Sequence, residues 1–203
     1  MQLLLVRHGQ TPSNLARALD SKPPGAPLTE EGHSQAAAFA ARIATSPVVA
    51  VYASTAIRAQ QTAEHIASTH GLDVQVIQGV QEVFVGDLEG KTTEEALKTF
   101  IEVYDKWTQD DLTACMPGGE SGQEVQARYL AAVEAIKAKH PDGLVVLVSH
   151  GGAIRLAAEW LAANVDGRVA KIGILPNTGH VLLEANGDGW QCLEWTGLEL
   201  MHD

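Results

Sequence analysis

LLLVRHG (residues 3–9) and LVVLVSHG (residues 144–151) are two apolar stretches that both end in His-Gly. Short runs of Val and Leu are typical of strands buried in a parallel sheet. In open α/β sheets the ligand lies beyond the carboxyl ends of the parallel strands. We therefore expect two such strands to carry His8 and His150 to the same crevice.

The rest of the chain alternates short apolar runs with longer helical segments, which is typical of an α/β fold. Buried strands are predicted at Leu3–Val6, Val48–Tyr52, Val74–Ile77 and Leu144–Val148, and a hairpin is predicted from His180–Glu184 and Trp190–Trp195 around residues 186–189. Helix starts are predicted at Thr11-Pro12, at Thr29, and at two capping boxes, Thr92–Glu95 and Ser121–Glu124. No linker divides the chain, so one domain over residues 1–203 is expected.

Composition excludes several classes of protein. The 203 residues include 14 Lys and Arg against 25 Asp and Glu, a net charge of −11, which argues against a nucleic-acid or anionic-membrane partner. Two cysteines are too few for a disulfide framework or a four-cysteine zinc site. The apolar start of the chain is too short for a signal peptide, and no apolar run approaches the ~18 residues of a membrane span. A cytoplasmic protein is expected.

Basic side chains gather at the predicted strand ends. Arg7 and His8 follow the first strand, Arg58 lies in the first turn of the helix after Val48–Tyr52, and His150 follows the last parallel strand. Helix N-termini at the same edge favour anions. Two guanidiniums and two imidazoles suit a phosphoryl group, and a neutral imidazole can accept one. The sequence therefore predicts a phosphate site.

Several motifs carry a family resemblance. Leu5–Thr11 resembles the Arg-His-Gly signature of the histidine phosphatase superfamily, the phosphoglycerate mutase-like proteins. The resemblance continues, in the family's order, through Asn14, residues 28–32, 54–63, 117–121 and 148–152. It implies a three-layer α/β/α sandwich with a mostly parallel central sheet.

The same resemblance assigns roles to residues. It implies His8 as the nucleophile, Arg7, Arg58 and His150 as the phosphate pocket, and a carboxylic acid as the proton donor, with no cofactor or metal. We also expect four residues to contact the substrate: Gln10, Asn14, Ser21 and Gly151.

Glu82 is the expected proton donor. It follows the strand at Val74–Ile77 and so can reach the crevice, and residues 80–90 resemble the family's phosphatase-type acid segment, in which the first Glu is the donor. Asp87 and Glu89 are the alternatives. Leu88 stands where the family usually has an aromatic residue, and we expect it to reshape the pocket wall.

The expected function is hydrolysis of a small phosphomonoester through phospho-His8, with Arg7, Arg58 and a protonated His150 holding the oxygens and Glu82 as general acid and base. A phosphoglycerate mutase is the first alternative. The resemblance implies that a mutase carries an extra insert with basic residues for a second phosphate, whereas the segment after Glu82 has only Lys91, Lys98 and Lys106 and then two aspartates. A metallohydrolase and a non-catalytic phospho-ligand binding protein are the others.

The remaining polar and aromatic residues suggest little chemistry. Five further histidines are expected at the surface: His33, His65, His70, His140 and His202. Tyr104 and Trp107 either line a substrate lid or anchor their helix. The apolar tail Leu198, Leu200 and Met201 can dock on a second copy, as a homodimer, or on the protein's own core.

Overall fold

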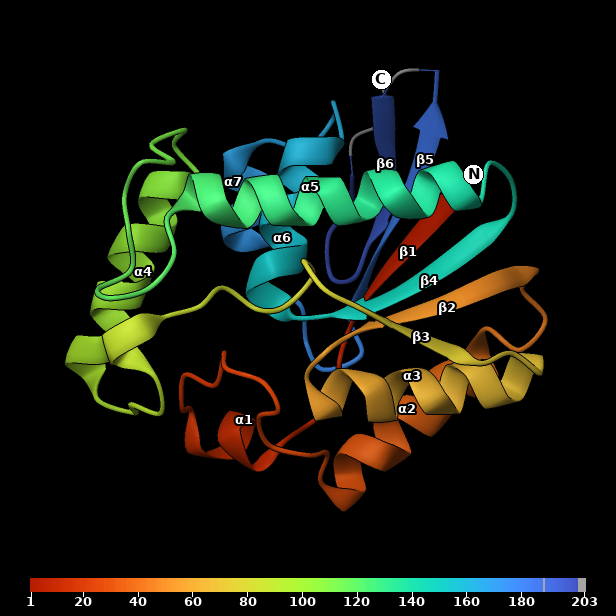
Figure 1. Ribbon diagram of the computed structural model, residues 1–203, viewed down its shortest axis with the longest axis horizontal. Helices are drawn as coiled ribbons and strands as arrows, with labels where there is room; N and C mark the ends of the chain where they lie inside the picture. The colour runs from red at the N-terminus through yellow and green to blue at the C-terminus, as the bar shows by residue number, and fades with distance from the viewer. Residues whose placement is uncertain (188, 201–203) are drawn as a thin grey trace.

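The computed structural model describes residues 1–187 and 189–200, and Figure 1 shows a central sheet between two layers of helices. The strands are β1 Gln2–Arg7, β2 Val48–Ser54, β3 Val74–Ile77, β4 Leu144–Ser149, β5 His180–Asn186 and β6 Gly189–Trp195. They lie in the order β3-β2-β4-β1-β5-β6. The pairs within β3-β2-β4-β1 are parallel, and β5 and β6 pair antiparallel. The expected mostly parallel sheet is confirmed.

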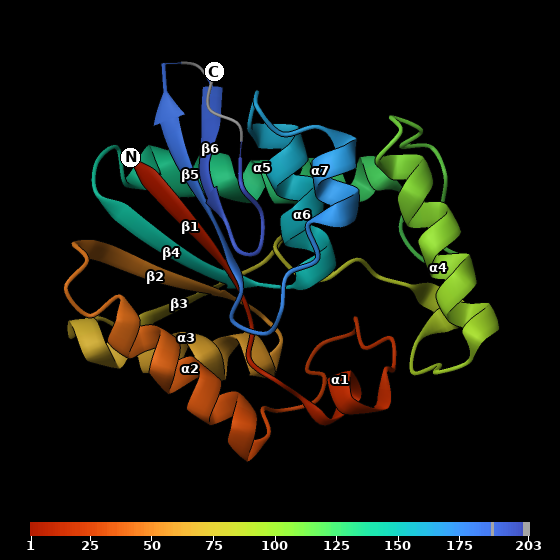
Figure 2. The same cartoon turned by 180° about the vertical axis from the view of Figure 1, so that it is seen from behind.

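The helices cover both faces of this sheet. They are α1 Pro12–Ala16, α2 Glu30–Arg42, α3 Ile57–His70, α4 Glu94–Trp107, α5 Gly122–Lys139, α6 Gly151–Leu161 and α7 Gly167–Ile172, with a short 3₁₀ helix η1 at Gly86–Leu88. α2 and α3 lie on one face and α5, α6 and α7 on the other, as the two opposite views show (Figures 1 and 2). None of the helices in the described part of the chain combines the length and hydropathy of a bilayer span.

The central strands β1 and β4 are apolar from Leu3 to Val6 and from Leu144 to Val148 because both of their faces are covered. Leu3 and Leu5 of β1 pack into the core under α5 and α6, whereas Leu4 and Val6 pack into the core under α2 and α3. The parallel register pairs Arg7 with Ser149. Since β1 and β4 end together, the residues that follow them, among them both His-Gly pairs, emerge side by side.

The predicted helix starts are confirmed with one difference. Thr11 caps α1, and Ser121 forms a reciprocal capping box with Glu124 at the start of α5. The capping box predicted from Thr92 is wrong, because Thr93 is the N-cap of α4 and its hydroxyl accepts the N–H of Ala96. Two consecutive threonines are both competent caps, so the local pattern could not choose between them.

Several side chains that the sequence left open are structural. Tyr104 and Trp107 are buried in a third apolar cluster beneath α4, so they anchor that helix. Leu198 and Leu200 pack against the main core, while Met201 lies outside the described residues.

Four of the histidines expected at the surface are half-buried and hydrogen-bonded. His33 bonds His65 at 3.1 Å, His70 bonds the carbonyls of Ile66 and Ile43, and His140 bonds Tyr52 at 2.8 Å. His202 is outside the described residues. Within residues 1–187 and 189–200, no group of three His, Cys, Asp or Glu side chains is placed to hold a metal ion.

Candidate active site

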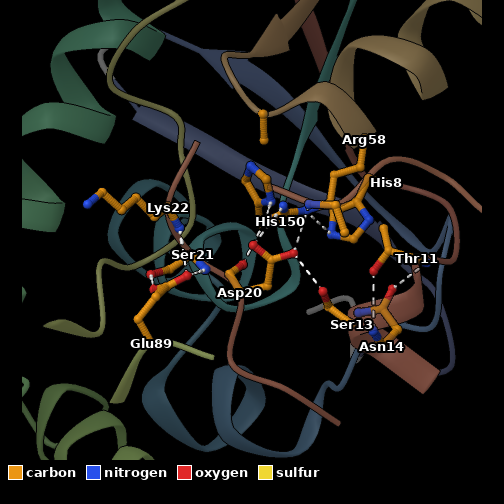
Figure 3. A network of polar contacts seen from close by, with 12 residues as sticks. His8, Thr11, Ser13, Asn14, Asp20, Ser21, Lys22, Arg58, Glu89 and His150 are labelled. Carbon is orange, nitrogen blue, oxygen red and sulfur yellow. Dashed lines mark hydrogen bonds and ion pairs between the residues drawn. The ribbon is translucent and has the colours of Figure 1, made fainter. Parts of the chain in front are cut away.

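The four basic side chains predicted from the strand ends meet at the carboxyl edge of the sheet. Figure 3 shows His8, His150 and Arg58 side by side. The two imidazole centroids are 5.3 Å apart. Arg58, from the first turn of α3, donates from Nε to His8 Nε2 at 3.1 Å and from Nη2 to His150 Nδ1 at 3.3 Å. The predicted convergence is therefore present, with Arg58 as its centre.

Hydrogen bonds fix which nitrogen of His8 carries the proton. Nδ1 lies 2.7 Å from the carbonyl oxygen of Gly9, which only accepts, so Nδ1 holds the hydrogen. Nε2 is then unprotonated, and its lone pair accepts the hydrogen bond from Arg58 Nε. The N–H of Gly9 is held in turn by Thr62 Oγ1 at 3.0 Å, so the segment after β1 is pinned to α3.

Both imidazoles are neutral. Burial lowers the pKa of His8 well below its ordinary value, and the positive charges of Arg58 and Arg7 lower it further. The pKa of His150 is also lowered well below its ordinary value, first by burial and then by Arg58. The expectation of a protonated His150 is therefore wrong for this arrangement. Its Nε2 hydrogen instead points to Ser54 Oγ at 2.7 Å.

Two guanidinium nitrogens in this cluster are buried without a hydrogen-bond partner, Arg7 Nε and Arg58 Nη1. Arg7 Nη1 donates to the carbonyl of Leu175 at 2.6 Å, and Arg58 Nη2 donates to the carbonyl of Asp20 at 2.7 Å. Buried donors of this kind normally find a partner, and charged ones bind anionic oxygen strongly. The cluster therefore presents a buried donor without any partner, Arg7 Nε, and a second, Arg58 Nη1, whose neighbour is a carboxylate at 3.4 Å.

Of the three candidate acids, Glu82 is the one that lines the cavity. Its carboxylate accepts the N–H groups of Val83 and Ala153 at 2.9 Å and of Gly152 at 3.1 Å, the last two at the start of α6. These bonds hold it at the positive end of the helix. The other two candidate acids are elsewhere: Asp87 is exposed, and Glu89 is bonded to Ser21 and the N–H of Lys22 (Figure 3).

Arg128 of α5 holds the loop that carries Glu82, and sequence reasoning missed it. Its guanidinium donates to the carbonyls of Gly79, Gln81 and Glu82 at 2.7–3.0 Å and pairs with Glu120 at 2.7 and 2.8 Å. No local motif marks Arg128, because its partners are distant in sequence.

A cavity of about 250 Å³ opens above these groups. The predicted site residues that line it are Arg7, His8, Asn14, Ser21, Arg58, Glu82 and Gly151. His150 lies behind Arg58, almost fully buried. Three expectations need correction. Gln10, expected to contact the substrate, accepts from Thr29 Oγ1 at 2.9 Å and does not line the cavity. Leu88, expected to reshape the pocket wall, packs under α4 and forms none of that wall. Ser21 lines the cavity, but its hydroxyl is occupied by Glu89 and the N–H of Val85.

Asp20 is a residue of the cavity that the sequence did not reveal. Its carboxylate Oδ1 lies 3.4 Å from Arg58 Nη1, and its Oδ2 accepts from Ser13 Oγ at 2.8 Å and from the N–H of Ala26 at 3.1 Å (Figure 3). Arg155, Phe100 and Leu175 also line the cavity without having been predicted. A negative charge thus faces the arginine cluster from the loop after α1.

Two sequence relatives and one solved structure match most of this chain. A 31% identical relative, phosphoglycerate mutase-like protein 4 of Arabidopsis thaliana, matches over 96% of this chain and 84% of its own. A metal-independent phosphoserine phosphatase of the same plant is 36% identical over 76% of this chain and 66% of its own. A solved mycobacterial glucosyl-3-phosphoglycerate phosphatase in complex with VO3 is 28% identical and superposes with a TM-score of 0.82 over 96% of this chain and 98% of its own.

The family itself is shown by a match along almost the whole chain. The sequence profile of the histidine phosphatase superfamily (branch 1) matches residues 3–197, which include all the cavity-lining side chains described above. With both His-Gly pairs, the arginines and the sheet in place, this protein belongs to the histidine phosphatase superfamily, branch 1.

Proposed function

We propose that the protein is a metal-independent phosphomonoesterase that hydrolyses small phosphate esters through a phosphohistidine on His8. One observation carries the proposal: His8 Nε2, which is unprotonated and accepts a hydrogen bond from Arg58 Nε, lines one cavity with Arg7, whose buried Nε has no hydrogen-bond partner. A phosphoryl group placed there would be bound through its oxygens and attacked at phosphorus by the same cluster.

The first step is an in-line displacement. The lone pair of His8 Nε2 forms a bond to phosphorus while the bond from phosphorus to the ester oxygen breaks. Glu82, in its acid form, donates a proton to that departing oxygen, which leaves as an alcohol. Arg7 and Arg58 hold the equatorial oxygens, where negative charge collects in the transition state.

The second step returns the enzyme to its starting state. A water molecule loses a proton to the carboxylate of Glu82, its oxygen attacks phosphorus, and the bond to His8 Nε2 breaks, releasing inorganic phosphate. His150 has a supporting role. A bound dianion offsets the positive field of Arg58 that lowers the pKa of His150, so this imidazole gains basicity when phosphate binds.

The side chains present favour hydrolysis over the alternatives. Asp20 and Glu82 line the cavity together with the arginines and would repel the second phosphate dianion that a mutase must hold. Arg7 and Arg58 would repel a catalytic metal ion beside His8 and His150. Phosphate binding alone does not require a carboxylate at the cavity, so the position of Glu82 in the same lining as Arg7 and Arg58 supports turnover.

Trapping the intermediate tests the proposal. Brief reaction with a radiolabelled phosphomonoester, followed by a denaturing quench, should leave a protein label that is stable to alkali and labile to acid. The label should be absent in His8→Asn and present in His140→Asn, a matched histidine bonded to Tyr52 away from the cavity. Hydrolysis by the wild type without any trapped label, under conditions that trap it in an established phosphohistidine enzyme, would contradict the covalent step.

A further inference from the structure

Arg155 is a third arginine of the cavity, and the proposed chemistry does not use it. It lies on α6, four residues after Gly151, and lines the cavity with Arg7 and Arg58. Its guanidinium is close enough to Arg7 to help lower the pKa of that side chain, although burial is the main cause. It is therefore near the phosphate pocket without belonging to it.

The guanidinium of Arg155 is fixed in place. Nε donates to the carbonyl of Ala170 at 2.7 Å and Nη2 to the carbonyl of Lys171 at 2.9 Å, both in the last turn of α7. Its Cζ lies 4.9 Å from the ring centroid of Tyr104, whose hydroxyl donates to the carbonyl of Gly152 at 2.8 Å. Because each of these partners is itself held, the side chain is pre-organised.

This arrangement leaves donors unused. An arginine has five N–H donors, and two of them serve the carbonyls of α7. Nη1 makes no hydrogen bond, and no carboxylate of residues 1–187 or 189–200 forms an ion pair with Arg155. An unpaired, rigid guanidinium at a cavity wall matches the planar fork of a carboxylate.

We infer that Arg155 binds a carboxylate on the leaving group, so that the preferred substrates are small phosphomonoesters of hydroxy acids; this inference rests on the proposed function. Charge decides for a carboxylate over a second phosphate. The cavity is lined by the cations Arg7, Arg58 and Arg155 and by two carboxylates, Asp20 and Glu82. Beside a phosphoryl dianion, a carboxylate adds one negative charge and a second phosphate adds two, so the carboxylates of the wall oppose a second phosphate more strongly.

A matched pair of substrates tests this. O-phosphoserine and O-phosphoethanolamine differ only in the carboxylate, and the wild type should favour phosphoserine in kcat/KM by about 10–100-fold, the usual effect of a charge-assisted bidentate contact. Arg155→Met should bring the ratio close to one, chiefly by raising KM for phosphoserine. Arg155→Lys, which keeps the charge, should retain part of the preference.

Lys171→Ala is the control. It removes the 2.6 Å ion pair between α7 and Asp105 while keeping the backbone carbonyl that Arg155 uses, so it should preserve the ratio. A wild-type ratio near one, equal losses on both substrates in Arg155→Met and Arg155→Lys, or a stronger preference for a bisphosphate would each overturn the inference. Turnover of p-nitrophenyl phosphate separates these outcomes from failure of the proposed function, which would abolish all three activities.

Discussion

Replacing Glu82 by Gln removes a proton donor while keeping the shape of the side chain. In the protein, Glu82 Oε1 accepts from Val83 and Ala153 and Oε2 accepts from Gly152. The amide oxygen of Gln can keep the two bonds of Oε1. Its NH2 group must then face the N–H of Gly152, so one bond to a charged acceptor is lost. We expect the free energy of unfolding to fall by about 1.5–3 kcal/mol.

The catalytic loss should be larger and should depend on the substrate. General acid catalysis contributes about 10²–10⁴ in rate, which corresponds to about 2.7–5.4 kcal/mol of activation free energy. An alkyl phosphate leaves as a basic alkoxide and needs the whole of this contribution. An aryl phosphate with an acidic phenol leaves readily as the anion, so we expect its loss to stay within about tenfold.

The measurement is kcat/KM for a series of phosphomonoesters, plotted against the pKa of the leaving group. This parameter covers the steps up to the first irreversible one, so it reports transfer to His8 and not the later hydrolysis, in which Glu82 acts again as base. The wild type should give a shallow slope and Glu82→Gln a steep one. Asp87→Asn, an exposed carboxylate on the same segment, should give the wild-type slope.

Parallel lines would refute the reasoning. If Glu82→Gln lowers kcat/KM by the same factor for every leaving group, its carboxylate does not protonate the departing oxygen. A steep slope in Asp87→Asn would assign the proton to that carboxylate instead. Thermal unfolding of each variant separates loss of structure from loss of the acid.

Three further predictions concern charge and close packing. Asp20→Asn removes the negative charge 3.4 Å from the guanidinium of Arg58, so inorganic phosphate should bind about tenfold more tightly in a calorimetric titration. An unchanged affinity would show that the Asp20 carboxylate does not weaken phosphate binding. Because the folded pKa values of His8 and His150 lie well below the unfolded value of about 6.5, the unfolded chain binds extra protons in acid. The free energy of unfolding should therefore fall as the pH drops below about 6.5, by up to about 1.4 kcal/mol per pH unit for each histidine. Urea titrations in phosphate-free buffer measure this dependence of the unfolding free energy on pH. The dependence should become weaker when both histidines are replaced by Asn. Gly9→Ala places a Cβ 2.5 Å from a backbone carbonyl oxygen and should cost about 1–3 kcal/mol in thermal unfolding together with activity. Gly71→Ala meets nothing within 4 Å but lies at φ +66°, so it should cost about 1–2 kcal/mol through backbone strain and leave activity intact.

The positions of the central strands, and the meeting of His8 and His150 at their ends, could be predicted because both faces of the central sheet are covered. Coverage on both faces makes Leu3–Val6 of β1 and Leu144–Val148 of β4 continuous apolar runs, which are visible in the sequence, and parallel strands must end at one edge. The meeting of His8 and His150 follows from that alone. Arg58 was predictable for the same reason, since α3 begins directly after β2.

What could not be predicted depends on contacts between distant segments. Arg128 touches the Glu82 loop from 46 or more residues away in the chain, and Asp20 meets Arg58 from a loop without regular structure. Gln10 was misplaced because a motif shows proximity in sequence, whereas Thr29 decides where its side chain goes. The protonation of His150 depended on burial, which the sequence does not show.

The arginines of this site explain how a buried histidine can serve as a nucleophile near neutral pH. On a surface, an imidazole with a pKa of about 6.5 loses its lone pair to a proton in mild acid. Buried beside Arg58 and Arg7, His8 keeps that lone pair, because a proton there would add a further positive charge away from water. The guanidiniums that exclude the proton are the groups that would draw in a phosphate dianion. The net charge of −11 does not oppose this, since three arginines line one cavity of about 250 Å³ that admits a small anion. Binding and nucleophilicity therefore have one physical cause, the burial of positive charge around a neutral ring.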